Sequence, residues 1–315
     1  MKKLNIAFIG VGSIAKRHMG NLVACMGERG WDYRIDVVRS GHGAGLDGTL
    51  ATWIHGSYVY GEEIPKDYDV VFVTNPTALH YETIQKYAAS TKSMFIEKPV
   101  FHHPNLDVGK LMLKEDGIYY VACPLRYTGV VQYLKNHIGC SRVFSARAIC
   151  SSYLPEWRPG TDYRTSYSAH KRLGGGVSID LIHEWDYMSY LFGFPDKVVN
   201  MRGTYSKLEI DSEDCSVYIA QSGTMLYELH LDYFGRGRMR QVELFLEGDT
   251  VVGDLEKAEV RFLRSGKTIS FQEQRNDSQK REISNFLDIL EGTAKNENSI
   301  ETALKVLKIA QGGEG

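Results

Sequence analysis

The chain has 315 residues, 43% hydrophobic and 24% charged, which is enough apolar material for about two domains and excludes disorder as the main state. Its 37 Lys and Arg nearly balance 39 Asp and Glu, which argues against a dedicated nucleic-acid binder or a protein of anionic membranes. The five cysteines are scattered without a CxxC pair, so we expect free thiols in a reducing cytoplasm and no metal site. They are Cys25, Cys123, Cys140, Cys150 and Cys215.

The first 125 residues predict strands that alternate with helices. Apolar runs of the buried-strand type occur at 4–9, 33–38, 69–74, 94–96 and 118–122. Apolar residues at helical spacing predict three helices. They lie between Ala15 and Met26, from Pro76 to about Ser90, and near 106–114. This alternation is typical of parallel βαβ units with right-handed crossovers.

The second half changes character from about Arg142, where period-two patterns predict strands. Two of these runs flank Ser222-Gly223, a good hairpin turn. The expected strands are 216–221, 224–234, 239–247 and 259–263, with one helix over 177–192 and two terminal helices near 280–311. We therefore expect two domains, residues 1–125 and residues 126–315.

The turn after the first strand carries the pattern GxGxxA. It reads Gly10-Val11-Gly12-Ser13-Ile14-Ala15 and opens the first expected helix. Gly10 permits a tight turn, Gly12 lets the backbone approach a pyrophosphate, and Ala15 allows close packing of helix on strand. The free N–H groups at the helix N-terminus attract the anion. The pattern predicts a dinucleotide site; the alternative is a glycine-rich turn without a ligand.

The end of the second strand selects the cofactor. It reads Val37-Val38-Arg39-Ser40, and Asp36 lies inside the strand rather than at its tip. Arg39 can pair with a 2′-phosphate and Ser40 can donate to it. The cofactor is therefore NAD(P), with NADP favoured over NAD, unless Arg39 is an ordinary surface residue.

Glu97-Lys98-Pro99 stands at the carboxyl end of another parallel strand, the edge at which open α/β sheets bind ligands. Lys98 there can hydrogen-bond a substrate hydroxyl, and Pro99 allows a cis bond. Taken alone, the tripeptide is also compatible with a lysine that is exposed to solvent and has no role in binding. Four other segments accompany it in order: GVGSIAKRH at 10–18, TNPTALH at 74–80, CPLRY at 123–127 and GGGVSIDLIHEWDY at 174–187.

This set of motifs resembles the glucose–fructose oxidoreductase, inositol dehydrogenase and MocA family over nearly the whole chain. The resemblance implies an α/β fold, with an N-terminal Rossmann doubly wound parallel sheet and a C-terminal α/β domain with a large, mostly antiparallel open sheet. That sheet commonly makes the subunit interface, so a homodimer or homotetramer is expected. The implied chemistry is hydride transfer between a nicotinamide and a carbon of a sugar, polyol or sugar nucleotide.

The resemblance also assigns residues. Glu97 and Lys98 match a pair that contacts cofactor ribose and substrate. Four residues match the segment that lines the nicotinamide and adenosine path: Thr74, Asn75, Pro76 and His80. Arg126, in the segment CPLRY, is a further candidate substrate contact.

The expected helix at 177–192 places Asp180, His183, Glu184 and Tyr187 on one face. Oxidation of an alcohol needs a base for the hydroxyl proton, and we assign that role to His183, with Asp180 as its carboxylate and Lys98 as electrostatic partner. Glu184 is expected at the substrate. The family spaces aspartate and histidine by four residues rather than three, so the resemblance supports His183 better than Asp180. A histidine satisfied by its own helix is the alternative.

A loop rich in aromatic and cationic side chains precedes the three glycines at 174–176. Its candidate substrate contacts are Trp157, Arg158, Tyr163, Arg164 and Tyr167. Such residues can stack on sugars and pair with phosphates, which indicates an anionic sugar; an arm that packs on a neighbouring subunit is equally compatible. Arg236, Arg238 and Arg240 share one strand parity and are expected in salt bridges across a subunit interface, with substrate binding as the less favoured alternative.

The favoured function is a cytoplasmic NAD(P)-dependent oxidoreductase with a small-molecule sugar substrate and with neither nucleic acid nor membrane as partner. Two alternatives stay open. One is a non-catalytic dinucleotide sensor, since Rossmann folds also regulate partners. The other is an enzyme that keeps and recycles a tightly bound NAD(P).

Overall fold

The computed structural model describes residues 2–41, 48–139 and 143–313. The chain forms two compact units, one from Met1–Ala122 with Gln279–Leu304 and the other from Cys123–Ser278 with Lys305–Gly315. The sequence division at residue 125 kept both terminal helices in the second domain. The structure differs, because it packs Gln279–Leu304 with the first unit.

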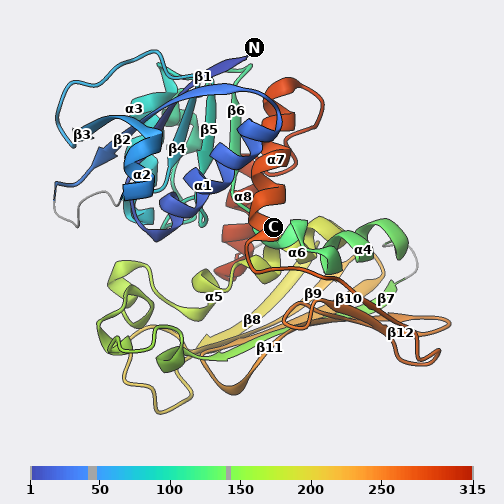
Figure 1. The fold of residues 1–315 in the computed structure, drawn as a ribbon. Coiled ribbons are helices and arrows are strands. Elements are labelled where there is room, and N and C mark those ends of the chain that lie inside the picture. Colours follow the sequence, from blue (N-terminus) through green and yellow to red (C-terminus); the bar gives the residue numbers. More distant parts are fainter. Residues whose placement is uncertain (1, 42–47, 140–142, 314–315) are drawn as a thin grey trace. The chain divides into compact units, whose positions relative to one another are not determined.

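The first unit contains a six-stranded sheet in which every pair is parallel (Figure 1). Its order is β3-β2-β1-β4-β5-β6, the doubly wound Rossmann order that the motifs predicted. The strands are β1 (Lys3–Ile9), β2 (Asp32–Arg39), β3 (Ile54–Val59), β4 (Val70–Val73), β5 (Ser93–Ile96) and β6 (Ile118–Val121). Only β3 was not expected. The order reverses between β1 and β4, where the turn after β1 lies.

Aromatic side chains explain why the chain returns to this unit. Its helices are α1 (Ser13–Glu28), α2 (Gly48–Trp53), α3 (His80–Ala88) and α7 (Asp277–Glu291). Phe286 of α7 packs edge-on against Phe72 and Phe95, with ring centroids 6.0 and 5.3 Å apart. Burying such a ring stabilises the fold by about 1.5–3 kcal/mol. Arg29, which follows α1 as its C-cap, adds an ion pair of 2.7 Å to Asp288 of α7.

The helix expected near 106–114 is a short 3₁₀ turn, Val108–Leu111. The Asp107 side chain caps it by accepting from the N–H of Gly109 at 3.0 Å. Met112 then adopts a left-handed conformation with φ 53°, which ends the turn. The expected position of helical structure is therefore correct, but it extends over one turn only.

The second unit contains an eight-stranded sheet of order β14-β13-β12-β11-β7-β10-β9-β8. It is mostly antiparallel, as expected, and its one parallel pair is β7 with β10. The strands are β7 (Val143–Tyr153), β8 (Lys197–Gly203), β9 (Cys215–Ser222), β10 (Met225–Asp232), β11 (Phe234–Leu246), β12 (Thr250–Asp254), β13 (Glu259–Phe262) and β14 (Thr268–Ser270). The predicted hairpin at Ser222-Gly223 is confirmed, since Met225 pairs with Ser222.

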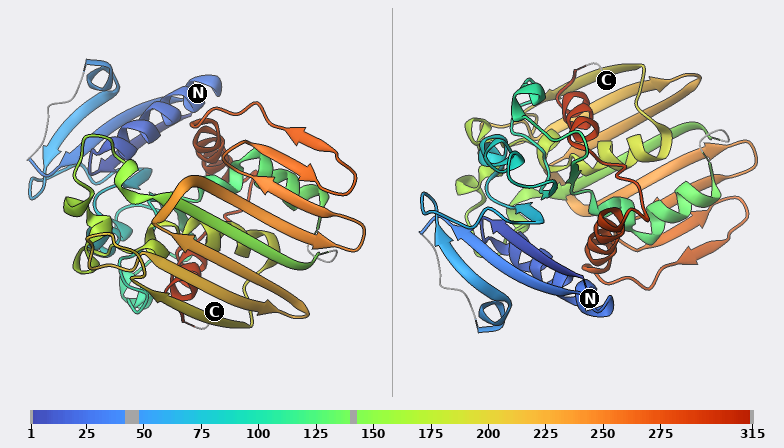
Figure 2. Two further views of the ribbon diagram at one scale, coloured as in Figure 1. Left: turned by 90° about the horizontal axis from the view of Figure 1, so that it is seen from below. Right: turned by 90° about the horizontal axis from the view of Figure 1, so that it is seen from above.

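Helices cover one face of this sheet. Figure 2 shows α4 (Gly129–His137) and α6 (His183–Phe192) on that face and open strands on the other. Trp185 of α6 is fully buried, with its ring edge-on to Tyr218 at 5.1 Å. The last helix, α8 (Ile300–Ala310), is fastened where Tyr218 Oη donates to the carbonyl of Ala310.

The single helix expected over 177–192 is two helices, α5 (Val177–Asp180) and α6. Leu181 leaves helical geometry with φ −97° and ψ 28° and ends α5. Asp180 and His183 therefore do not share one continuous helix face, and that expectation was wrong.

Two further observations concern the described part of the chain. None of its helices is both long and apolar enough to cross a membrane. Four cysteines are buried free thiols: Cys25, Cys123, Cys150 and Cys215. Cys140 lies outside the described residues.

Candidate active site

The turn after β1 has the geometry of a dinucleotide cradle. Gly10 has φ +91°, and a Cβ on it would lie 2.6 Å from Asn75 Cα, so no other residue fits. Gly12 caps α1, and a Cβ built on it meets nothing within 4 Å. Ala15, fully buried, lets α1 approach the sheet. The open space before the first N–H groups of α1 fits the pyrophosphate of NAD(P), with Gly12 and Ser13 exposed to it.

The segment after β4 supports this turn. Thr74 Oγ1 donates to the Gly10 carbonyl at 2.8 Å, which ties β4 to the turn. Asn75 Nδ2 donates to Thr83 Oγ1 at 2.8 Å, while the buried Oδ1 of Asn75 has no hydrogen-bond partner among the described residues. Pro76 is exposed beside them. The side chain of Asn75 is therefore buried behind the turn, where its amide nitrogen links Thr83 to Tyr60.

His80 is buried rather than presented to a ligand. Its Nε2 lies 3.0 Å from the Asn75 carbonyl and its Nδ1 lies 3.2 Å from the Val100 carbonyl. Burial lowers the pKa of His80, which keeps the ring neutral. His80 therefore has a structural role, because its ring lies between the backbone carbonyls of Asn75 and Val100.

Glu97 and Lys98 follow β5 at the same edge of the sheet. The Lys98–Pro99 bond is cis, as the sequence allowed. Glu97 Oε2 accepts from the backbone N–H of Lys98 at 3.1 Å, and Glu97 Oε1 contacts Nε2 of the buried His18. Burial favours a higher pKa for Glu97, but the hydrogen bond and charge of His18 outweigh it and lower the pKa. Glu97 is thus an anion that holds the backbone of the lysine.

The tip of β2 carries Arg39, half-buried, and Ser40, exposed. Asp36 is fully buried and accepts from Tyr68 Oη at 3.0 Å and from Arg34 Nη2 at 3.3 Å. The carboxylate of Asp36 therefore lies in the core of the unit. The charged residue at the end of the strand is Arg39.

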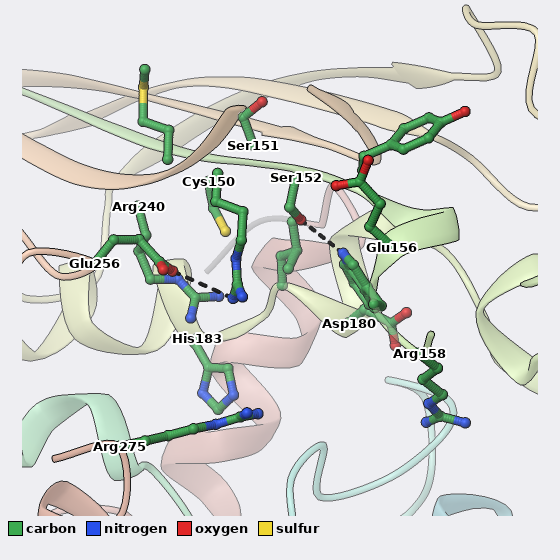
Figure 3. A pocket seen from close by; sticks show the side chains of 15 residues that line it. Cys150, Ser151, Ser152, Glu156, Arg158, Asp180, His183, Arg240, Glu256 and Arg275 are labelled. Atoms are coloured by element: carbon green, nitrogen blue, oxygen red, sulfur yellow. Dashed lines mark hydrogen bonds and ion pairs between the residues drawn. The ribbon is translucent and has the colours of Figure 1, made fainter. Parts of the chain in front are cut away.

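The second unit has its own cavity of about 330 Å³ (Figure 3). His183, at the start of α6, points into it with partial exposure. The other lining residues are Cys150, Ser151, Ser152, Tyr153, Glu156, Trp157, Arg158, Asp180, Leu181, Arg238, Met239, Arg240, Glu256 and Arg275.

Asp180 is held by two tyrosines. Its Oδ1 accepts from Tyr167 Oη and its Oδ2 from Tyr233 Oη, each at 2.5 Å. Burial, together with the charge of Asp180, raises the pKa of both phenols, so they remain donors. Asp180 thus reaches the cavity as a carboxylate fixed by residues from two other segments.

Glu184 does not line the cavity. It is fully buried, and its Oε1 lies 2.7 Å from Nε of Arg240. Burial raises the pKa of Glu184 despite this neighbour. Arg240 was expected at a subunit interface, but the structure corrects this: its side chain lines the cavity above Glu184.

The remaining candidates separate into two groups. Trp157 and Arg158 line the cavity. Arg126 is buried in a two-bond pair with Asp186, at 2.9 and 2.8 Å, and Arg164 pairs with Asp162 at 2.9 Å. The guanidinium groups of Arg126 and Arg164, both expected at the substrate, thus each bind a carboxylate of the protein itself.

Tyr163 also differs from the expectation, since its hydroxyl accepts from the backbone N–H of Glu209 at 3.2 Å. Sequence reasoning missed Arg275 and Glu256, which line the cavity. Arg275 belongs to the segment between β14 and α7, where no motif or periodicity marks it.

A family model described as "Oxidoreductase family, NAD-binding Rossmann fold" matches residues 4–113. No curated protein matches the chain in sequence comparison. Among solved structures, levoglucosan dehydrogenase in complex with NADH and levoglucosan has a TM-score of 0.81 at 18% identity, over 98% of this chain and 96% of that one.

Two sugar-nucleotide enzymes have the same fold. UDP-N-acetylglucosamine 3-dehydrogenase GnnA from Acidithiobacillus ferrooxidans has a TM-score of 0.75 at 17% identity, over 100% of this chain and 97% of that one. The WlbA dehydrogenase from Bordetella pertussis, in complex with NADH and UDP-GlcNAcA, has a TM-score of 0.74 at 18% identity, over 99% and 95%. The resemblance predicted from the motifs is thus confirmed: residues 4–113 match the NAD-binding Rossmann domain of the Gfo/Idh/MocA oxidoreductase family, and the whole chain has the fold of its dehydrogenases.

Proposed function

We propose that this protein is an NAD(P)-dependent oxidoreductase that transfers a hydride between the nicotinamide and a hydroxyl or carbonyl carbon of a sugar, polyol or sugar nucleotide. The observation that carries the proposal is the cradle at Gly12, open at the N-terminus of α1 where the strand order reverses. A polar cavity with His183 in the second unit supports it. The structural neighbours named as sugar dehydrogenases support the substrate class.

The chain's own residues supply binding, orientation and proton handling. The N–H groups at the start of α1 hold the pyrophosphate, and Gly12 allows the close approach. His183 takes the hydroxyl proton as the alcohol is oxidised, and Lys98 stabilises the developing alkoxide. Asp180, clamped by its tyrosines, contributes a fixed negative charge to the cavity wall. The bound nicotinamide would supply the hydride acceptor.

Substitution of the two proton-handling residues tests this proposal. Lys98→Ala and His183→Ala should each lower kcat by about 100-fold or more, since general acid–base groups contribute about 10²–10⁴. Binding of NADH, followed by its fluorescence, should stay within twofold of the wild type. Lys110→Ala and His137→Ala, exposed residues outside both sites, are the matched controls. Near-normal turnover of either active-site variant would remove that residue from the mechanism.

We further propose that NADP is preferred over NAD. Arg39 at the tip of β2 supports this, because a guanidinium binds a phosphate through paired hydrogen bonds and Asp36 is committed elsewhere. Arg39→Asp should raise the Kd for NADP far more than the Kd for NAD. Equal changes for the two cofactors would contradict the preference.

A homodimer or homotetramer through the open sheet face is also proposed. That face carries exposed Val199, Met201 and Ile219, with 64%, 70% and 51% of their surface accessible. Val199 pairs with Ile219 across β8 and β9, so the apolar side chains lie on one side. Such a patch favours association with a second copy. Light scattering of the purified protein should give a multiple of the chain mass, and a monomer at micromolar concentration would contradict the proposal.

A further inference from the structure

The charged groups that line the cavity are not equally compensated. Arg240 has Glu184 beside it at 2.7 Å, and Arg238 has Glu256 at 3.6 Å. The carboxylate of Asp180 has its two tyrosine donors. These two arginines therefore each have a carboxylate at ion-pair distance, and the aspartate has two hydrogen-bond donors.

Two lining arginines differ. Arg158 and Arg275 have no carboxylate at ion-pair distance among the described residues, although both line the same cavity as His183. In Figure 3 the guanidinium group of Arg275 lies at the end of the cavity where the His183 ring points, and Arg158 lies across from them. Glu156, the remaining lining acid, stands well apart from both guanidinium groups in that view.

The peptide that carries Arg158 is anchored. The indole Nε1 of the preceding Trp157 donates to Ser152 Oγ at 3.0 Å, and its ring packs edge-on to Tyr233 with centroids 5.3 Å apart. The backbone N–H of Trp157 donates to the Leu154 carbonyl at 3.1 Å. Arg158 therefore extends from a fixed base, which lowers the entropy lost when its guanidinium meets a ligand.

Cavity size limits the ligand. Small-molecule sites have volumes of about 300–1,000 Å³, and this cavity of about 330 Å³ stands at the lower end of that range. A monosaccharide-sized molecule suits it. Planar guanidinium groups bind carboxylate and phosphate oxygens with charge-assisted hydrogen bonds.

We propose that the cavity binds a monosaccharide-sized substrate that carries an oxyanion, and that Arg158 and Arg275 hold this oxyanion. The oxyanion is a carboxylate, as in a sugar acid, or a phosphate, as in a sugar phosphate. The inference rests on the proposed function, because it takes the cavity with His183 as the substrate site. It adds the charge of the substrate and two residues that determine specificity.

Binding measurements separate this inference from the activity. Calorimetric titrations of the NADH-loaded protein would use three ligands of each sugar configuration: the hexose, the hexuronate and the hexose 6-phosphate. We expect one of the two anions to bind at least tenfold more tightly than its neutral hexose, and to bind more weakly as salt is added. The anion that binds identifies the carboxylate or the phosphate as the group recognised.

Arg158→Gln and Arg275→Gln should each weaken anion binding by roughly 10- to 100-fold, as expected for a lost charge-assisted hydrogen bond, and leave binding of the neutral hexose unchanged. Arg172→Gln, an exposed arginine of the same loop that does not line the cavity, is the matched control and should behave as wild type. Circular dichroism checks the folding of each variant.

Equal affinity for neutral and anionic sugars, or unchanged anion binding in both variants, would overturn the inference and leave the dehydrogenase proposal intact. Anion binding that depends on both arginines, without hydride transfer to any ligand of the panel, would support the inference and contradict the proposed function.

Discussion

The paired substitutions Gly10→Ala and Gly12→Ala distinguish the folding role of the turn after β1 from its ligand role. The two glycines are two residues apart in one turn, yet their surroundings are opposite. A methyl group on Gly10 would lie 2.6 Å from Asn75 Cα and 2.7 Å from Asn75 N, in a backbone with φ +91°. A methyl group on Gly12 would meet no protein atom within 4 Å.

The two sites predict different magnitudes. Alanine at Gly10 loses about 1–2 kcal/mol to the left-handed backbone and about 1–3 kcal/mol to overpacking against β4. We therefore expect its free energy of unfolding to fall by about 2–5 kcal/mol. Alanine at Gly12 meets no such contact, so its stability should stay within about 0.5 kcal/mol of the wild type. The added methyl occupies the space proposed for the pyrophosphate, so affinity for NAD(P) should fall at least tenfold.

The assay combines urea denaturation with titration of NADH and NADPH by fluorescence, on the wild type and both variants. The predicted result is a stable Gly12→Ala protein that no longer binds cofactor and a Gly10→Ala protein with a clearly lower unfolding midpoint. Wild-type cofactor affinity in Gly12→Ala would refute the cradle. Wild-type stability in Gly10→Ala would refute the steric argument.

Two further predictions concern buried charges. Arg240→Met leaves the buried Glu184 without its cation and should lower the free energy of unfolding, measured by urea denaturation, by about 3–5 kcal/mol. Arg147→Met breaks a more exposed pair with Glu243 and should lower it by at most about 1 kcal/mol. Equal losses in the two variants would contradict the argument from burial. The pKa of Glu97 lies below its ordinary value of 4.5, so the pair with His18 stabilises the fold above about pH 4.5, and this contribution is lost as the pH falls through the lowered pKa. His18→Gln should flatten that acid limb of the unfolding free energy, and an unchanged pH dependence would argue against the pairing.

Local patterns were sufficient for five of the six strands of the first sheet. Its buried strands are short apolar runs, and the turn at Gly10 has a geometry that only certain residues allow, so both are readable from neighbouring residues. β3 was missed because the sequence of Ile54–Val59 is neither a continuous apolar run nor a regular alternation of apolar and polar residues, and it contains Gly56. Its place next to β2 depends on parallel pairing with the preceding strand, which no local pattern of residues marks.

Long-range partners explain the errors at the cavity. The spacing of Asp180 and His183 suggested one helix face, but the chain breaks at Leu181 and the carboxylate is taken by Tyr167 and Tyr233. Strand parity grouped Arg240 with its neighbours and could not show that a buried glutamate on α6 faces it. Arg275 had no signal at all, because its position depends on the fold of a segment without periodicity.

The central claim is hydride transfer from a sugar carbon to the nicotinamide, and isotope transfer tests it most directly. The protein would be incubated with the oxidised cofactor and sugars, sugar acids and sugar phosphates deuterated at their hydroxyl-bearing carbons. Mass spectrometry of the recovered cofactor gives the readout. We predict one deuterium in the reduced nicotinamide ring for the wild type and none above background for His183→Ala. Unlabelled cofactor with every substrate, in a protein that binds NAD(P), would contradict the claim.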